Sequence, residues 1–289
     1  MKNIKTAVFF SLCVLLLYTA CPHNERPGPG INPGSQDSAP YVEGGISLVV
    51  SRDKKTIELT VKASGSSNIV LEGAEPSSVT NNFSGPVTVK DRVLILKPSA
   101  GEQPIEFSCT DQKIMRINAS GCKTLTSLIC NGNLLDTLKV HTEAKLTHVT
   151  CSENRLTNFD ARFCKELVSL ECGNNKLTSL DLSGLNYLTK ADCWQNNLTE
   201  LKLTGCTALK QIECYNNDLK ENAFIALLNA LPDRTSAGTE GKAVLYKEGE
   251  TGNVTDFTTP EALTNAVAAA TNNNWKLYKK TDTEPGEEI

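Results

Sequence analysis

Apolar residues in the middle of the chain recur with a period of 21 residues. In residues 125–135 the pattern is L-x-x-L-x-C-x-x-N-x-L, with polar residues between the apolar positions. The same frame returns, without insertions, at residues 146–156, 167–177, 188–198 and 209–219. A fixed period of this length predicts a solenoid, in which each repeat forms one coil and buries its apolar side against its neighbours.

One cysteine marks the same position in each repeat. These ladder cysteines are Cys109, Cys130, Cys151, Cys172, Cys193 and Cys214. Alternate side chains of a strand point the same way, so Leu128 and Cys130 are expected to face inward and Ile129 outward. The first copy is degenerate, as expected for a coil that joins a cap, and has other residues in the frame positions: Pro104, Phe107, Gln112 and Ile114.

This frame resembles the leucine-rich repeat, in the short 21-residue bacterial class that often has cysteine at the third strand position. The resemblance covers residues 104–221, about two fifths of the chain. It implies the α/β class and a right-handed leucine-rich-repeat solenoid of short parallel strands over residues 101–221. The asparagine after each ladder cysteine is expected to bond backbone groups of adjacent coils where the chain turns, which gives an asparagine ladder of Asn133, Asn154, Asn175, Asn196 and Asn217.

The ladder cysteines allow three interpretations. Neighbouring strands are about 4.8 Å apart, which a disulfide could span, but parallel side chains along one vector suit its torsion poorly. Metal binding is disfavoured because the chain has no C-x-x-C motif and only three histidines. Buried free thiols that pack as small hydrophobic groups are the preferred interpretation. A second set recurs in alternate repeats, too far apart for bridges: Cys122, Cys164 and Cys206.

Both flanks of the repeats change pattern. Residues 41–100 alternate as strands do and predict a β-sandwich-like module that caps the first coil, with strands at 46–51, 56–62, 68–72, 87–90 and 93–97. Hairpin connections are expected at 53–55 and 63–67. Residues 222–280 predict an αβ cap with helices at 222–231 and from the N1 residue Pro260 to Ala270, and strands around residues 244–246 and 275–278. We expect Trp275 to fill the core of that cap and the acidic residues 281–289 to be a disordered tail.

The N-terminus predicts export. Lys2 and Lys5 precede an apolar run that is too short to span a bilayer, and Ala20 then precedes Cys21. This arrangement resembles the lipobox of bacterial lipoproteins of the Bacteroides type, which implies a signal peptide over 1–20, lipidation of Cys21, and an outer-membrane or cell-surface location. Residues 21–40, rich in proline and glycine, are expected to be a disordered tether. Ordinary secretion, with Cys21 as a spare thiol, is the alternative.

Charge and motifs narrow the function. The formal net charge is −4 and no basic cluster stands out, so neither nucleic acid nor an anionic membrane surface is an expected partner. Membrane contact is expected only through the lipid anchor. No histidine pairs with a nucleophile and no glycine-rich phosphate loop follows a strand, so we expect that the protein is not an enzyme and needs no cofactor or metal. We also expect it to be a monomer.

Outward-facing positions of the last three coils carry the residues of interest. Trp194 and Tyr215 occupy the same slot on adjacent coils, where exposed stacked aromatics could grip a sugar or a peptide. Glu171, Asp192 and Glu213 form a carboxylate column beside them. A solvated face is the preferred interpretation of that column over a site for calcium or a cationic partner.

The function expected is that of a surface-anchored adhesin or receptor-like module that binds a host or envelope protein, as the resemblance implies. Glycan capture through Trp194 and Tyr215 is the first alternative. A passive envelope spacer is the second.

Overall fold

The computed structural model describes residues 38–65, 68–98, 103–282 and 286–289, which all belong to one compact unit, Gln36–Ile289. The expected signal peptide, Cys21 and the tether up to residue 37 lie outside the described residues. The described end of the tether is held in place: the Asn118 side chain donates to the carbonyl of Ala39 (3.1 Å), and the Ser47 hydroxyl donates to that of Pro40 (2.5 Å). The expectation of disorder up to residue 40 is therefore wrong for these last residues.

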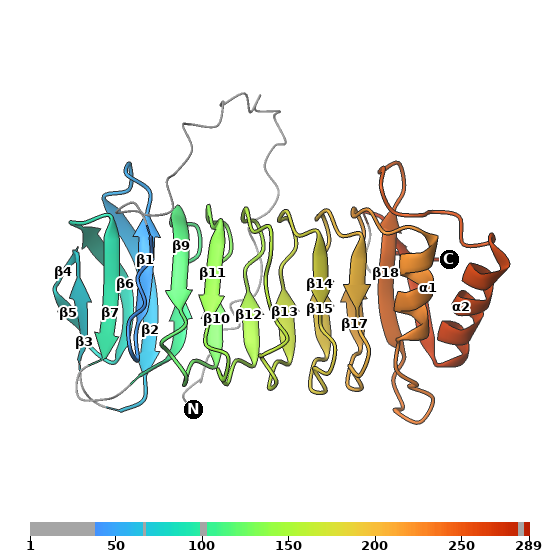
Figure 1. Cartoon of the computed structure of the whole chain (residues 1–289), viewed down its shortest axis with the longest axis horizontal. Helices are drawn as coiled ribbons and strands as arrows, with labels where there is room; N and C mark the ends of the chain where they lie inside the picture. The colour runs from blue at the N-terminus through green and yellow to red at the C-terminus, as the bar shows by residue number, and fades with distance from the viewer. Residues whose placement is uncertain (1–37, 66–67, 99–102, 283–285) are drawn as a thin grey trace, which may run out of the picture. The chain divides into compact units, whose positions relative to one another are not determined.

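The repeats form coils whose strands lie side by side in one parallel sheet (Figure 1). Each strand ends just before a ladder cysteine: β8 (Pro104–Ser108), β10 (Ser127–Ile129), β12 (His148–Thr150), β13 (Ser169–Glu171), β15 (Lys190–Asp192) and β17 (Gln211–Glu213). The register advances by one repeat at every step, so Leu128 is opposite Val149 and Leu170 is opposite Ala191. The predicted repeat solenoid of short parallel strands is confirmed.

The inward side of each coil is apolar and buried. Every ladder cysteine, and every residue two positions before one, is at most 1% exposed. Burial of this kind contributes about 25 cal/mol per Å² of apolar surface, and a slip of one residue would turn the whole set toward solvent. The nine cysteines of the described residues are all buried free thiols.

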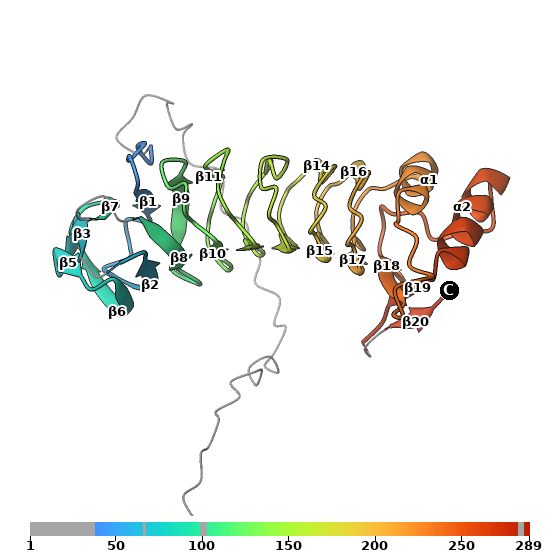
Figure 2. The ribbon, with the colours of Figure 1, turned by 90° about the horizontal axis from the view of Figure 1, so that it is seen from below.

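A second row of short strands runs along the opposite side of the coils, as Figure 2 shows. It consists of β9 (Ile114–Ala119), β11 (Thr137–Val140), β14 (Ser179–Asp181) and β16 (Glu200–Lys202). The two rows are joined by turns in which the second residue after each ladder cysteine has a positive φ, between 52° and 63°. Four of these six residues are of types that tolerate a positive φ, namely Asp111, Gly132, Asn174 and Asn216, whereas Glu153 and Gln195 are not.

Each asparagine of the ladder links two coils. Asn154 Nδ2 donates to the carbonyl of Cys130 in the preceding coil (2.9 Å) and to that of Cys151 in its own (3.1 Å). Its Oδ1 accepts the N–H of Leu135 (2.9 Å). Asn175, Asn196 and Asn217 repeat this arrangement. The buried backbone groups at the turns are paired in this way, which avoids the cost of leaving them unsatisfied.

The asparagine ladder has one more rung than the repeats supply. Asn253 Oδ1 accepts the N–H of Leu219 (2.9 Å), and its Nδ2 donates to the carbonyl of Cys214 (2.9 Å). Asn253 comes from the C-terminal segment, 36 residues after Asn217, so the 21-residue frame did not predict it. At the other end, Gln112 Oε1 accepts the N–H of Glu58 (2.9 Å) and ties the first coil to the N-terminal strands.

The N-terminal strands extend both rows of the solenoid. They are β1 (Ile46–Val50), β2 (Thr56–Ala63), β3 (Ile69–Glu72), β4 (Ala74–Glu75), β5 (Ser78–Val79), β6 (Asn82–Val89) and β7 (Val93–Pro98). β1 pairs with β7 and β9, whereas β2 pairs with β6 and β8, so each belongs to a different sheet. β3 again lies in the sheet of β1.

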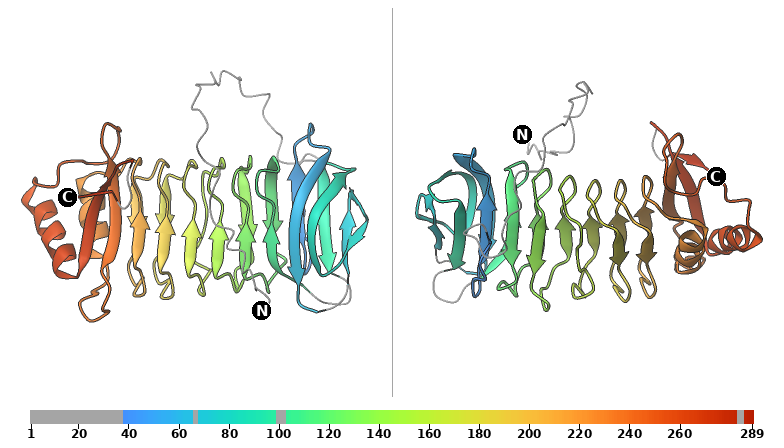
Figure 3. Two further views of the ribbon diagram at one scale, coloured as in Figure 1. Left: turned by 180° about the vertical axis from the view of Figure 1, so that it is seen from behind. Right: turned by 45° about the horizontal axis from the view of Figure 1, so that its top comes forward.

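The hairpins expected at residues 53–55 and 63–67 are therefore wrong, because each connection crosses between the sheets. A β1–β2 hairpin would place both strands in one sheet and so leave the outer edge of either β8 or β9 without a partner, and open strand edges of this kind invite aggregation. Figure 3 shows the N-terminal strands and the coils in one continuous row from two directions.

The segment after the repeats adds two helices and two further parallel strands. They are α1 (Glu221–Asn229), β18 (Gly241–Lys247), α2 (Glu261–Asn272) and β19 (Trp275–Lys280). β18 continues the repeat sheet beside β17, and β19 lies beside β18. Trp275 is 2% exposed and its Nε1 donates to the carbonyl of Pro232 (2.8 Å), so it fills the core of this segment.

Two expectations for the C-terminal segment need correction, and so does the expected fold class. Pro260 is the N-cap of α2 rather than its first helical residue, and no side chain caps that helix. Glu287–Glu288 form a short strand, β20, that pairs antiparallel with β19, where a disordered tail was expected.

The solenoid itself is mostly β: both helices of the described residues follow the last repeat, so the α/β class applies only to the C-terminal segment. No described helix is long and apolar enough to cross a membrane.

Candidate functional site

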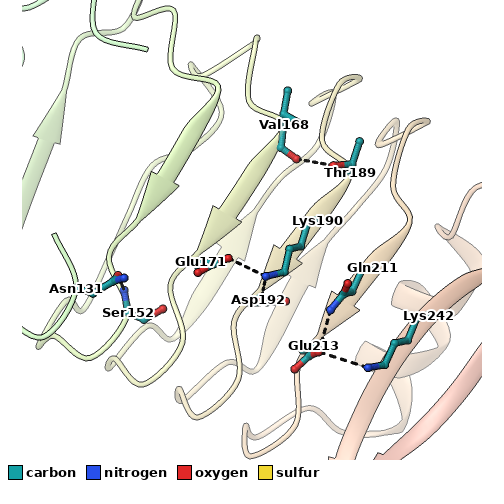
Figure 4. A network of polar contacts seen from close by, with 10 residues as sticks. All are labelled: Asn131, Ser152, Val168, Glu171, Thr189, Lys190, Asp192, Gln211, Glu213 and Lys242. Atoms are coloured by element: carbon teal, nitrogen blue, oxygen red, sulfur yellow. Dashed lines mark hydrogen bonds and ion pairs between the residues drawn. The ribbon is translucent and has the colours of Figure 1, made fainter. Parts of the chain in front are cut away.

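The strand face, meaning the outward side of β10, β12, β13, β15 and β17, carries a row of ion pairs near its C-terminal end (Figure 4). Lys190 is the centre of this row. Its Nζ lies 2.7 Å from Glu171 Oε1 and 2.8 Å from Asp192 Oδ2. One ammonium therefore joins two carboxylates that the repeat places on adjacent strands, β13 and β15.

The third carboxylate is held by different partners. Gln211 Nε2 donates to Glu213 Oε1 (3.0 Å), and Lys242 Nζ lies 3.8 Å from the same oxygen. Lys242 belongs to β18, outside the repeats, in register with Gln211. Sequence reasoning missed it because β18 has no 21-residue frame, although its alternating apolar pattern was visible.

The carboxylate column is not the solvated face that its outward alternation suggested. Asp192 is 9% exposed and is classed with the buried residues, and Glu171 and Glu213 are half-buried. The reason is that long neighbouring side chains, Lys190 above all, cover the short Asp192. Asp192 Oδ1 is buried and has no hydrogen-bond partner among the described residues.

Burial changes the ionisation of this group. It raises the pKa of Asp192 to about 6, against the lowering effect of Lys190, and the charges of Glu213 and Glu171 add to the rise. The pKa of Lys190 is raised as well: burial opposes its charged form, but hydrogen bonds to Asp192 and Glu171 outweigh burial. The column therefore holds a carboxylate that changes charge in a mildly acidic range.

The aromatic pair lies beside the column, one residue beyond each ladder cysteine. The rings of Trp194 and Tyr215 stack with centroids 5.8 Å apart and planes at 6°. The indole also lies flat against the preceding coil, where a Cβ added to Gly173 would be 2.5 Å from Trp194 Cε2. On the other side, Lys280 Nζ is 5.9 Å from the centre of the Tyr215 ring.

The ring faces are thus taken by neighbours within the chain. Gly173 and Tyr215 cover the two faces of Trp194, and Lys280 lies over the ring of Tyr215. Both residues are half-buried, so it is their edges that reach solvent. The two aromatics stack on adjacent coils, as predicted. They were also expected to be exposed, and this is wrong, because both residues are half-buried and their ring faces are covered.

The N-terminal half of the strand face has a different character. Ile129 is 37% exposed and His148 is exposed, and the outward position after Cys130 is Asn131, whose Oδ1 accepts the N–H of Ser152 (2.8 Å). Its outward positions on β10 and β12 hold no carboxylate and no lysine. Charge and aromatic groups are therefore concentrated on β13, β15 and β17.

The cysteines offer no reactive site. Burial raises the pKa of every ladder thiol, to about 12 for Cys151 and Cys214, so the nucleophilic thiolate is not formed at neutral pH. In the second set, the Cys122 and Cys206 thiols donate to the carbonyls of Pro104 (3.2 Å) and Leu182 (3.1 Å). No group of three or more possible metal ligands occurs in the described part of the chain.

A surface groove of about 470 Å³ lies on the opposite side, along β14 and β16. Its charged groups are paired with one another: Arg162 Nη2 lies 2.8 Å from Asp160 Oδ2, and Lys202 Nζ lies 3.3 Å from Glu200 Oε2. This groove contains none of the residues that the sequence singled out. The strand face remains the surface where those residues meet.

Comparison with known proteins gives structural likenesses but no family. No family model matches the chain, and no curated protein matches it. Among solved structures, the functional domain of InlJ from Listeria monocytogenes, described as including a cysteine ladder, matches with 18% identity and a TM-score of 0.28. The match covers 52% of this chain and 52% of that one, so the aligned region spans about half of each protein.

Proposed function

We propose that this chain is a non-enzymatic, surface-anchored protein-interaction module of leucine-rich-repeat type, which binds a protein partner through the strand face of β13, β15 and β17. One observation carries the proposal. The inward positions of the coils repeat almost unchanged, whereas the outward positions differ from coil to coil and gather three carboxylates on adjacent strands and two aromatics just beyond the ends of β15 and β17. Packing of the core explains why the inward residues are constant. It does not explain which residues occupy the outward positions.

The aromatic pair of this surface suits a protein partner. Tyrosine and tryptophan are enriched at protein interfaces, and the residues that dominate binding lie in well-packed, nearly desolvated surroundings. Trp194 and Tyr215 are held in one geometry by stacking, and Lys190 holds Glu171 and Asp192 in another. A surface already ordered in this way loses little conformational entropy when a partner binds.

Glycan capture receives less support from the same geometry. A sugar would stack on an open aromatic face, and both faces of Trp194 are covered by Gly173 and Tyr215. Ring edges beside charged groups are better suited to the mixed polar and apolar surface of a protein. A glycan array with the full chain tests this alternative directly, and specific retention of a glycan that depends on Trp194 would favour it.

The anchor belongs to the same proposal and is supported by sequence alone. The apolar run from Ala7 to Leu17, Ala20 before Cys21, and the proline- and glycine-rich stretch that follows are typical of an exported lipoprotein of the Bacteroides type. A diacylglyceryl group would hold the chain at the cell surface because each buried methylene contributes about 0.8 kcal/mol. Cys21→Ser should move the protein from the membrane fraction to the soluble fraction. Failure of the wild type to incorporate labelled fatty acid would replace the anchor with ordinary secretion.

The binding experiment compares two double variants of the full chain. Trp194→Ala/Tyr215→Ala removes the stack from the strand face. Phe163→Ala/Tyr187→Ala removes two aromatics that are 46% and 64% exposed and lie in turns outside that face, so it controls for loss of aromatic surface. We expect a partner captured from host or envelope extract by the wild type to be retained by the control and lost by the first variant.

Each outcome discriminates between functions. Equal capture by both variants would move the site away from the strand face, to the N-terminal strands or the opposite groove. No specific capture by the wild type from either extract would favour a passive spacer. Both variants should stay folded, with the first losing a few degrees of melting temperature, because stacked aromatic pairs contribute about 0.5–1.5 kcal/mol beyond their burial.

A further inference from the structure

The outer edge of β19 is covered by a short segment of the chain itself. Residues Gly286–Ile289 run antiparallel to β19, with Glu287 opposite Lys279 and Glu288 opposite Tyr278. The N–H of Ile289 donates to the carbonyl of Leu277 (3.0 Å). This segment ends the repeat sheet on its C-terminal side, since β20 is the outermost strand of that sheet.

The charges of the segment and the strand are complementary. β18 and β19 together carry five lysines: Lys242, Lys247, Lys276, Lys279 and Lys280. Lys279 Nζ lies 3.0 Å from Glu287 Oε2, and Lys276 Nζ lies 3.9 Å from Glu288 Oε2. The same two lysines also pair with Glu240 (3.3 Å) and Glu248 (3.2 Å), so the segment adds two carboxylates to ion pairs that are already present at this edge.

The hold on this segment is weak. Its paired strand is two residues long, and the Glu287 and Glu288 side chains are 64% and 56% exposed. Exposed ion pairs of this kind add little stability. Gly286 has φ +99° and approaches the strand so closely that a Cβ there would lie 2.5 Å from the Lys279 carbonyl oxygen. Backbone pairing over a few residues is therefore what keeps the segment in place.

We propose that the outer edge of β19 is a docking site for an extended acidic segment of a protein partner, and that Gly286–Ile289 occupies this site in cis. An incoming strand would take over the backbone pairing of Leu277 and Lys279, which is the general mode of strand addition to a sheet edge. Its specificity would come from carboxylates placed against Lys276 and Lys279. The segment already in place shows the chemistry that the edge accepts.

The site is distinct from the strand face but continuous with it. Lys276 lies opposite Lys242 in the β18–β19 register, and Lys242 is the partner of Glu213. A partner that holds the strand face could therefore also reach the β19 edge. The proposal does not depend on the aromatic pair, and it can hold or fail by itself.

The experiment uses a fluorescein-labelled peptide with the sequence of residues 281–289 and two forms of the full chain. In Glu287→Lys/Glu288→Lys, the segment in cis is repelled by Lys276 and Lys279, so the edge is vacated. A segment in cis acts at an effective concentration on the order of millimolar, so the wild type should bind the peptide poorly. We expect the variant to bind at least tenfold more tightly, and a peptide with glutamine in place of glutamate to bind about two- to tenfold more weakly than the original, because exposed ion pairs contribute little each.

Hydrogen exchange provides an independent measurement. Amides of residues 275–280 should exchange faster in the variant than in the wild type and be protected again by the peptide. Gly286→Val detaches the segment by steric conflict without a change in charge, and it should give the same result if the lysine variant folds poorly.

The matched control is Glu72→Lys/Glu75→Lys, which makes the same charge change far along the chain, where these residues pair with Lys97 (2.6 Å) and Lys90 (2.9 Å). Peptide affinity that is equal in the wild type and both edge variants would overturn the proposal. Unchanged exchange in both edge variants would do the same.

Discussion

Trp194 and Tyr215 stack with their ring planes at 6°, although they are 21 residues apart in the sequence and belong to different coils. The repeat alone does not produce this contact, because every other coil also has a residue in that slot. It depends on Gly173 in the preceding coil, which leaves room for the indole to lie flat. The proposed binding surface therefore depends on a glycine as much as on the two aromatics.

Gly173→Ala should displace the indole of Trp194 while the coil stays intact. The added Cβ would lie 2.5 Å from Trp194 Cε2, and φ at this position is not in the left-handed region, so alanine itself is tolerated. Near-UV circular dichroism should show loss of the stacked-ring signal, with a fall in melting temperature of a few degrees. Ser152→Ala, one coil earlier in the same slot, is the control and should change neither. An unchanged near-UV spectrum in Gly173→Ala would show that the stack does not depend on this glycine.

Asp192→Asn should stabilise the protein at neutral pH and lose that advantage in acid. The pKa of Asp192 is raised from 3.8 to about 6 in the folded state, so the folded chain prefers the neutral form. Below about pH 4 the group is neutral in both states. As the pH rises through 6, the folded state must carry a buried charge that it disfavours, and it loses up to about 3 kcal/mol, the worth of a shift of about two pKa units.

The measurement is chemical denaturation of both proteins at pH 8 and pH 4. We expect the variant to be more stable by about 1–3 kcal/mol at pH 8 and equal to the wild type at pH 4. Asp218→Asn is the control, since that exposed side chain pairs with Lys220 (2.7 Å) at the surface and should shift stability by less than about 0.5 kcal/mol. Equal stability of Asp192→Asn and wild type at both pH values would show that Asp192 is not strained by burial.

Substitutions of Cys172 should separate packing from chemistry. The thiol is fully buried, and its pKa is raised well above the usual range by burial. Cys172→Ala removes one packed atom and should cost about 1–2 kcal/mol, whereas Cys172→Asp forces a charge into the core and should cost more than about 4 kcal/mol or prevent folding. In the wild type, the ladder thiols should react with a thiol reagent only after denaturant is added. Disulfide-linked ladder peptides in a non-reducing digest would contradict this account.

The interior of the solenoid was predictable because packing imposes the same demand on every coil. Leu128, Cys130 and Asn133 recur for reasons that a single repeat already contains: strand alternation, a small buried group, and a polar turn that must be satisfied. The exterior was less predictable, since alternation says only that Asp192 points outward. Whether Asp192 is solvated depends on the length of the Lys190 side chain beside it. Both residues are at outward positions that vary from repeat to repeat, so the repeat pattern does not predict their contact.

Strand partners at the two ends were not predictable either. The alternation in residues 56–62 identifies a strand but not its neighbour, and the open edge of β8 in the first coil decides that β2 pairs there. The same holds for β20, whose glutamates look like a disordered tail until Lys279 provides a partner. In both cases the position of the segment is determined by the edge strand with which it pairs. That edge exists only in the folded solenoid, so the sequence of the segment does not reveal it.

Asn253→Ala should destabilise the protein as much as removal of a repeat asparagine. Asn253 receives one hydrogen bond from the Leu219 N–H and donates to the carbonyls of Cys214 (2.9 Å) and Leu245 (2.8 Å). The change would remove three hydrogen bonds where water has little access; the Cys214 carbonyl would keep its bond from Asn217 Nδ2 (3.0 Å), and each group left unsatisfied costs about 1–3 kcal/mol. We expect Asn253→Ala and Asn217→Ala each to lose about 2–4 kcal/mol in the free energy of unfolding. Asn265→Ala, on the exposed side of α2, should be neutral or slightly stabilising because alanine is the better helix former. If Asn253→Ala behaves like Asn265→Ala instead, the ladder ends at Asn217, and the C-terminal segment is held to the coils by apolar packing and strand pairing alone.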